Sequence, residues 1–307
     1  MNDTHTGPLN VIIDTDAGDD VDDVLALAFA LLRPELAVRA LTTVTADSGV
    51  RAQIVAQLLE VMGREDVPYA PGMNLPLRQL LPEEYAQLVK PGFRIKQGGF
   101  VKDAAQLAPP REDAIQLIGD TAEKHAGDIA LIGIGPLTNI AVALRRYPRL
   151  ASQLKWIAIM GGEFQFNHRE HNVKWDPDAA SIVFSSGVPL FVGTWSATRK
   201  FVLMPEDCER IRATGTPLTD ALSACIDMWW PTKGSKPGPV MYDLAPILWS
   251  IDRSYYPTQP MHVTVENRSE ISMGITLPGT GSPNAEVATD MKVDEVKRLY
   301  LETIGVT

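Results

Sequence analysis

Apolar and polar positions form two alternating patterns along the chain. Short apolar runs, each of the length of a buried strand, recur between longer stretches in which apolar residues return every three or four positions. The runs that predict strands are Val11–Ile13, Val38–Val44, Ile129–Ile134, Trp156–Met160 and Leu190–Val192. The stretches that predict helices are Asp23–Leu32, Val50–Met62, Asp113–His125, Thr138–Arg146 and Pro177–Ser186.

This alternation predicts an α/β fold, with an open, mainly parallel sheet and helices on both of its faces. In such sheets, ligands bind beyond the carboxyl ends of the strands, where loops lead into helices. The loops expected there are rich in polar residues or glycine, and read DTDAGDDVDD, TADSG, GIGPLTN and GGEFQFNHREHN. We therefore expect these loops to line one crevice.

The length of 307 residues is compatible with one large core, and we expect a single domain over residues 1–307. Two segments, Gly72–Pro110 and Trp230–Pro239, are rich in proline and glycine and are predicted to run over the surface. Long loops of this kind often form the rim or lid of a site, but a plain surface excursion explains them equally well.

The formal net charge of −10 disfavours nucleic acid polymers and anionic membranes as partners, because the long-range field repels both. Cys208 and Cys225 are the only cysteines, so neither a disulfide framework nor a zinc site is indicated. The first residues, MNDTHTGPLN, lack the features of a secretory signal, and the longest apolar run, Val24–Leu32, is too short to span a membrane. We expect a cytoplasmic protein.

Charge is concentrated after the first predicted strand, where Asp14, Asp16, Asp19, Asp20, Asp22 and Asp23 occur within ten residues. Capping of the following helix explains one or two of these aspartates. It does not explain the rest, because their mutual repulsion needs compensation, and a hard divalent cation with oxygen ligands supplies it. The cluster therefore favours a metal site.

The spacing of the aspartates differs from the twelve-residue calcium loop that lies between two helices. The cluster lies instead between a strand and a helix, which fits two kinds of enzyme. One transfers phosphoryl groups through a strand-end aspartate with magnesium, and the other uses a metal to assist attack of water on a glycosidic carbon. GIGPLTN lacks the lysine and glycine spacing of phosphate-binding loops, and its glycines are expected to permit a tight turn into the helix at Thr138.

The segment DTDAGDDVDDVLALAFAL resembles the N-terminal signature of the inosine–uridine nucleoside hydrolase family, with two extra residues before the last aspartate pair. Further similarities follow in order along nearly the whole chain: IGIGPLTNIA, MGG at 160–162, Glu170 with Asn172, DPDAA at 176–180, Tyr242–Asp243, VTVEN with GIT, and VDEVKRLYLETI. The resemblance implies the nucleoside hydrolase fold, a calcium cofactor, a small-molecule nucleoside substrate and a homodimer or homotetramer.

The resemblance also implies roles for individual residues. Asp16 would act as general base toward a calcium-bound water, which then attacks the ribose carbon of the N-glycosidic bond. The implied calcium ligands are Asp16, Asp23, Asp243 and the backbone carbonyl of Ile134. The implied substrate contacts are Asp22 and Asn172 on the ribose hydroxyls and Glu170 on the 5′-hydroxyl, together with Asp243, whereas Asp14 is expected to support the loop.

The chain departs from the family pattern around the substrate. Asp47 stands where many members have an asparagine, and Asn167 is the candidate for a ribose-binding asparagine in a shortened loop. Tyr242 replaces the histidine often implicated in protonating the leaving base, and Trp195 stands where an aspartate is common. Other candidates for contacting the base are His168, His171 and Trp229, although packing or surface roles explain such residues as well.

Three functions therefore compete. The first is hydrolysis of purine or pyrimidine ribonucleosides to ribose and free base. The second is a magnesium-dependent phosphatase that forms an aspartyl-phosphate on Asp14. The third is a nucleoside- or ribose-binding protein that keeps the metal site without turnover, a reading suggested by Tyr242.

Overall fold

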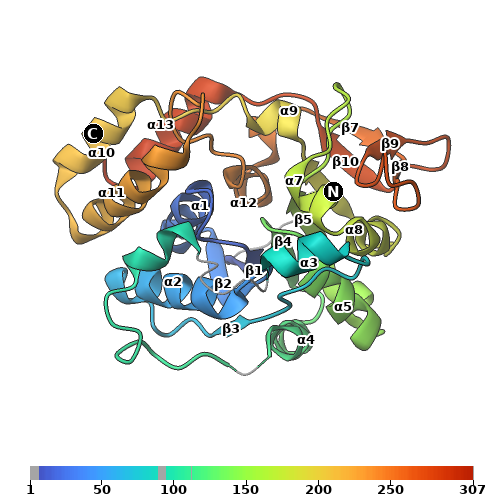
Figure 1. The fold of residues 1–307 in the computed structure, drawn as a ribbon, viewed down its shortest axis with the longest axis horizontal. Coiled ribbons are helices and arrows are strands. Elements are labelled where there is room, and N and C mark those ends of the chain that lie inside the picture. Colours follow the sequence, from blue (N-terminus) through green and yellow to red (C-terminus); the bar gives the residue numbers. More distant parts are fainter. Residues whose placement is uncertain (1–6, 89–94, 112, 307) are drawn as a thin grey trace.

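A computed structural model describes residues 7–88, 95–111 and 113–306 of the chain. A central eight-stranded sheet has the order β3-β2-β1-β4-β5-β6-β10-β7, and a smaller sheet pairs β8 with β9 (Figure 1). The strands are β1(Leu9–Thr15), β2(Leu36–Thr43), β3(Tyr69–Pro71), β4(Ile129–Gly133), β5(Leu154–Met160), β6(Leu190–Gly193), β7(Thr258–Met261), β8(Val263–Val265), β9(Thr276–Pro278) and β10(Ala285–Ala288).

Neighbouring strands of the large sheet run parallel, except that β7 pairs antiparallel with β10. The expected α/β fold with a mainly parallel, mixed sheet is therefore confirmed. All strands expected from the apolar runs are present; β1 is longer in part because buried Thr15 continues the pairing, and β2 begins two residues earlier than expected, at Leu36. The expectation missed the short β3 and the strands of the C-terminal third, whose residues are partly exposed.

Helices cover both faces of the sheet, because its central strands are apolar on both sides. In β1, Val11 and Ile13 belong to one core cluster while Ile12 belongs to the other, as the twofold alternation of a strand requires. The helices are α1(Asp22–Leu32), α2(Ser48–Val61), α3(Pro82–Leu88), α4(Ala114–Lys124), α5(Thr138–Arg146), α6(Leu150–Gln153), α7(His171–Trp175), α8(Pro177–Phe184), α9(Trp195–Thr198), α10(Pro205–Thr214), α11(Pro217–Trp229), α12(Leu244–Ile251) and α13(Val293–Thr303), with 3-10 turns at Lys96–Phe100, Trp230–Thr232 and Arg253–Tyr255.

The two cores divide these helices between them. Side chains of α1, α2, α11, α12 and α13 contribute to one cluster, and side chains of α4, α5 and α8 contribute to the other. The predicted helices are present with shifted ends; Asp113, for example, caps α4 through bonds from Ile115 N and Gln116 N. Helices α10 to α12 were not predicted.

The two segments expected on the surface are partly structured. Gly72–Pro110 contains α3 and the 3-10 turn at Lys96–Phe100, while residues 89–94 of it lie outside the described residues. Trp230–Pro239 folds back toward the sheet ends and ends beside Leu203, whose N–H donates to Pro239 O at 2.8 Å. Both cysteines are free and buried. Within the described ranges, no helix is long and apolar enough to cross a bilayer.

Candidate active site

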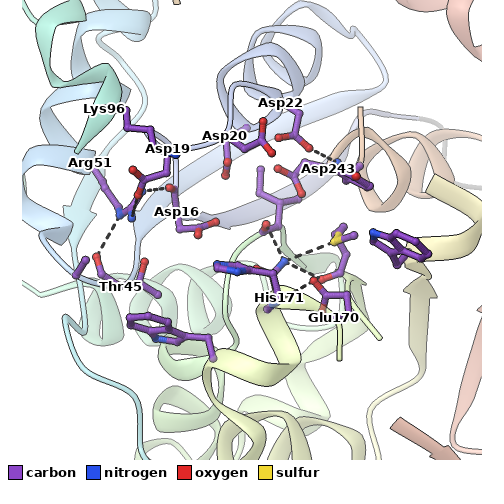
Figure 2. A pocket seen from close by; sticks show the side chains of 18 of the residues that line it. Asp16, Asp19, Asp20, Asp22, Thr45, Arg51, Lys96, Glu170, His171 and Asp243 are labelled. Carbon is purple, nitrogen blue, oxygen red and sulfur yellow. Dashed lines mark hydrogen bonds and ion pairs between the residues drawn. The ribbon is translucent and has the colours of Figure 1, made fainter. Parts of the chain in front are cut away.

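A cavity of about 510 Å³ opens at the carboxyl ends of the central strands. It draws residues from the loops that follow β1, β2, β4, β5 and β6, so the loops expected to converge do meet (Figure 2). The lining consists of Asp16, Asp19, Asp20, Asp22, Asp23, Thr45, Ala46, Arg51, Leu88, Lys96, Ile134, Met160, His168, Glu170, His171, Asn172, Trp175, Trp195, Lys236, Tyr242 and Asp243. Its size and its mixture of apolar and convergent polar groups suit a small molecule.

Two of the clustered aspartates open helix α1 without acting as its cap. The N-cap residue is Val21, which makes no side-chain capping bond, and Asp22 and Asp23 follow in the first turn. Both carboxylates are buried, at 2% and 4% exposure. Asp23 accepts a hydrogen bond from the Thr15 hydroxyl at 2.6 Å. Since capping does not account for these buried charges, they need another partner.

Asp243 joins these two aspartates from the start of α12. Carboxylate oxygens of Asp22, Asp23 and Asp243 all lie within 4.8 Å of one another, and Asp243 N donates to Asp22 Oδ2 at 3.3 Å. Burial raises the pKa of each carboxyl well above its usual range, and the neighbouring aspartates raise it further. Such a group of buried like charges could hold a metal ion, which would supply the missing positive charge.

Asp16 lines the same cavity beside this group, and its carboxylate interacts electrostatically with Asp23 and Asp243. Figure 2 shows the side chains of Asp16, Asp22 and Asp243 directed toward a shared space. Burial raises the pKa of Asp16, while the nearby charges of Arg51 and His171 lower it. A buried carboxylate with a raised pKa at a cavity wall is typical of an acid–base group.

Arg51, on α2, ties the loop after β1 to the turn after β2. Its guanidinium donates to the backbone carbonyls of Asp16 and Ala17, to Thr45 O at 3.1 Å and to Asp19 Oδ2 at 2.7 Å. Thr45 and Ala46 have φ angles of 74° and 50°, which are unfavourable for residues with a Cβ. Arg51 thus holds a strained turn against the acidic loop, a role the sequence did not reveal because the pairing is tertiary.

Asn172 and Glu170 enter from the loop after β5. Asn172 Nδ2 donates to Ile134 O at 3.3 Å and to Met160 O at 3.2 Å, which places the Ile134 carbonyl at the cavity wall. Glu170 caps α7, accepting from Asn172 N and Val173 N, and also accepts from Gly162 N at 3.1 Å. Burial raises the pKa of Glu170, which these backbone bonds partly offset.

Three residues expected at the substrate do not line the cavity. Asp47 is exposed and caps α2 by accepting from Val50 N at 3.1 Å. Asn167 is exposed on its loop, and Trp229 is 2% exposed within the core cluster that includes α1. Asp47 is thus a helix cap, Asn167 a surface residue and Trp229 a core aromatic.

Asp14 also lies behind the cavity rather than on its wall. It is 1% exposed, and its Oδ1 accepts from Thr42 Oγ1 at 2.6 Å and from Asn139 Nδ2 at 2.8 Å. Burial raises the pKa of Asp14 to about 7, although both hydrogen bonds lower it. These contacts fit the expected loop-supporting role and leave Asp14 badly placed to attack a phosphoryl group.

Part of the cavity wall is aromatic and basic. The rings of His168 and Trp195 have centroids 4.4 Å apart and are tilted by 33°, and Tyr242 lies beside Lys236, whose Nζ is 5.4 Å from the tyrosine ring. His171 lines the cavity close enough to affect the pKa of both Asp16 and Glu170. The sequence drew attention to these aromatic and histidine residues but not to Lys236.

The structure gives a reason for glycine in the segment GIGPLTN that was not expected from the sequence. Neither Gly133 nor Gly135 has a positive φ. A Cβ on Gly135 would lie 2.8 Å from Asp16 N and 2.9 Å from Asp16 Oδ1. Gly135 is therefore required for close packing against Asp16, and the backbone at Gly133 and Gly135 does not adopt the left-handed conformation that would itself require glycine.

If Asp16 takes part in the reaction that the family resemblance implies, this packing predicts that Gly135→Ala lowers kcat by about 10²-fold, because displacing a reacting group by about an ångström has effects of that size. Steady-state rates on the nucleosides that the resemblance implies as substrates measure the loss. Gly98→Ala is the control, since its Cβ meets only Val50 Cγ1 at 3.6 Å. Equal rates for Gly135→Ala and the native protein would contradict a role for Asp16 in turnover.

The capping position of Asp47 predicts that Asp47→Ala destabilises the fold by about 1 kcal/mol, the usual effect of a lost N-cap, while turnover changes little. Urea denaturation and steady-state kinetics on the same preparation separate the two effects. A loss of turnover of more than tenfold, with unchanged stability, would instead place Asp47 at the substrate.

Comparison with known proteins agrees with this geometry. The sequence pattern of the family described as inosine-uridine preferring nucleoside hydrolase matches residues 11–298. The pyrimidine-specific ribonucleoside hydrolase RihA of Salmonella enteritidis PT4 is 30% identical over 300 residues, covering 92% of this chain and 94% of that protein. RihA of Escherichia coli O8 has the same identity and coverage.

Solved structures show the same fold. The plant nucleoside hydrolase PpNRh1 superposes with a TM-score of 0.85 at 27% identity, covering 98% of this chain and 100% of that one. The purine-preferring ribonucleoside hydrolase of Gardnerella vaginalis superposes with a TM-score of 0.82 at 24% identity, covering 96% and 98%. With a family pattern matching nearly its whole length and the acidic loop placed at the sheet's carboxyl edge, this chain belongs to the inosine-uridine preferring nucleoside hydrolase family.

Proposed function

We propose that this protein hydrolyses the N-glycosidic bond of ribonucleosides, releasing ribose and free base, in a calcium-dependent reaction with Asp16 as general base. The observation that carries the proposal is the convergence of Asp16 with the buried group Asp22, Asp23 and Asp243 on one wall of the cavity. Family membership makes the chain an N-glycosyl hydrolase by class. The purine and pyrimidine specificities of the relatives leave both kinds of base as candidates.

The residues fit a hard divalent cation. Their donors are carboxylate oxygens, and burial followed by repulsion from neighbouring aspartates raises the pKa values of Asp22, Asp23 and Asp243. We propose that Asp16, Asp23, Asp243 and the carbonyl of Ile134 hold calcium, with Asp22 close enough to share it. Bound calcium would supply a Lewis acid that lowers the pKa of water at the site.

The remaining groups position the sugar and receive the proton. Cleavage of an N-glycosidic bond proceeds through a ribose with oxocarbenium character, which negative charge beneath the ring stabilises. Asp16 would accept a proton from the attacking water. Asp22 and Asn172 would bind the ribose hydroxyls. Glu170, which lies below Asp22 and Asp243 in the view of Figure 2, would bind the 5′-hydroxyl.

The competing functions are less well supported. A phosphatase acting through Asp14 needs that carboxylate exposed to substrate, whereas it is buried beneath Thr42 and Asn139. A binding protein without turnover is compatible with Tyr242 but gives no reason for an ionisable Asp16 beside the acidic group. Hydrolysis therefore explains more of the site.

A panel of common nucleosides, incubated with the protein and calcium, tests the proposal. We expect free base and reducing sugar in equal amounts from at least one of uridine, cytidine, inosine, adenosine and guanosine. Tight binding of ribose without release of base would favour the binding protein, and a trapped beryllium fluoride adduct on Asp14 would favour the phosphatase.

A further inference from the structure

Lys236 is a cationic residue at the aromatic side of the cavity to which neither the sequence motifs nor the proposed reaction assign a role. Its Nζ lies 2.6 Å from Asp20 Oδ2, 5.4 Å from the ring centroid of Tyr242 and 5.9 Å from that of Trp229. The side chain is 33% exposed and forms part of the cavity lining. It thus lies beside Tyr242 and next to the acidic loop.

The loop that carries Lys236 is held by a bond within it and by a bond at its C-terminal end. Lys233 Nζ donates to Lys236 O at 2.6 Å, and Leu203 N donates to Pro239 O at 2.8 Å. Gly238 packs so closely that a Cβ there would lie 1.9 Å from Leu203 O. The position of Lys236 is therefore built into the fold rather than left to a free surface chain.

The other positive side chains of the cavity are differently placed. The guanidinium of Arg51 is engaged by the backbone of the acidic loop and by Asp19. Lys96 is exposed and lies beside Arg51 in Figure 2, across the cavity from Asp243. Among the described residues, Lys236 is the lysine or arginine of the lining that lies against Tyr242, where the family resemblance expects help for the leaving base.

We propose that Lys236 is the catalytic residue that stabilises the departing base, by placing an ammonium ion where the base develops negative charge. This inference rests on the proposed hydrolase function and adds the leaving-group residue that the replacement of histidine by Tyr242 left unassigned. Asp20 positions the ammonium group through the 2.6 Å ion pair.

The step balances without any further reactant. The bond between C1′ and the base nitrogen breaks with its electron pair going to the base, and the water oxygen forms the new bond to C1′. Asp16 takes the proton lost by the water. The base leaves as an anion paired with the Lys236 ammonium and is then protonated by solvent, while Asp16 returns its proton to solvent, so the sum is nucleoside plus water giving ribose plus neutral base.

The charges around Lys236 favour a role as a permanent cation over a role as a proton donor. Burial lowers the pKa of Lys236, but the carboxylates of Asp20 and Asp22 outweigh it and the net pKa is raised. A fixed cation of this kind stabilises charge that appears only as the bond breaks.

Two substrates separate this role from a structural one. Uridine needs help for its leaving base, whereas 4-nitrophenyl β-D-ribofuranoside releases a stable phenolate that needs none. We expect Lys236→Met, which keeps most of the apolar stem, to lower kcat on uridine by about 10²–10³-fold, the usual effect of removing one transition-state contact. On the nitrophenyl riboside we expect a change of less than about threefold.

A second variant and a control complete the experiment. Asp20→Asn is expected to give a smaller loss that is again confined to uridine, and Lys200→Met, which removes a surface lysine paired with Asp290, to change neither rate. Equal losses on both substrates, in either cavity variant, would show that the ion pair merely holds the loop and would overturn the inference. Full uridine activity in Lys236→Met would overturn it as well.

The activity of the native protein separates a failure of the proposed function from a failure of the Lys236 assignment alone. If it releases no base from uridine or inosine, the proposed function fails and the inference fails with it. If the native protein is active and the Lys236→Met variant shows no selective loss, only the assignment of Lys236 is wrong.

Discussion

Asp16→Asn is expected to lower kcat for nucleoside hydrolysis by about 10³–10⁴-fold, at the upper end of the range for a lost general base. The amide has nearly the same shape, so it preserves packing against Gly135 but cannot accept the proton of the attacking water. Steady-state release of free base, measured with saturating calcium, determines the loss. Asp290→Asn, a change of the same kind at an exposed residue paired with Lys200, is the control.

The stability of the calcium-free Asp16→Asn variant should not fall together with its activity. Burial raises the pKa of Asp16 and outweighs the attraction of Arg51 and His171, so replacing its carboxylate by a neutral amide removes a desolvation cost in the calcium-free protein. We therefore expect the calcium-free variant to be at least as stable as the native protein by thermal denaturation. Loss of activity together with unfolding would mean that Asp16 maintains the fold, and turnover equal to the native rate would refute it as the base.

Asp243→Ala is expected to abolish both turnover and the stabilisation of the protein by calcium. Asp243 contributes the one carboxylate of the buried group that comes from outside the first loop, so its removal leaves Asp22 and Asp23 without the third donor. At a calcium concentration 100 times Kd, the native protein should gain about 2.7 kcal/mol of stability, because calcium binds only the folded state. Thermal denaturation with and without a chelator measures this gain.

Asp252→Ala is the matched control, since Asp252 caps a 3-10 turn at the other end of α12 by accepting from Ser254 N. The control should keep the full calcium-induced shift. An unchanged shift in Asp243→Ala, or a native protein that calcium does not stabilise, would contradict the assignment of the buried group as the metal site.

The local part of the site could be predicted because it depends on contiguous residues. A strand followed by aspartates and a helix places Asp16, Asp22 and Asp23 at one sheet edge whatever the rest of the chain does. Asp243 is different, because it is 220 positions after Asp23 and only the family resemblance connected the two before the fold was known. The alternating apolar runs predicted the parallel sheet for the same local reason.

Other features depend on tertiary contacts that no local pattern records. Arg51 reads in the sequence as one charged residue on a helix, and Lys236 as one of two lysines in a surface loop. Conversely, Asp47 was a candidate site residue because it stands where many family members have an asparagine, yet the helix that starts at Ser48 uses its carboxylate as a cap. An aspartate in such a loop can either cap the following helix or contact the substrate, and the direction of its side chain decides between the two roles.

The central claim is that water cleaves the N-glycosidic bond at this site. Incubating the native protein with uridine and calcium in ¹⁸O-labelled water, followed by mass spectrometry, tests it most directly. We predict free uracil and an equal amount of ribose that carries one ¹⁸O atom at its anomeric carbon, with no uracil released when a chelator replaces calcium. Absence of uracil release in calcium, with inosine equally inert, would contradict the claim.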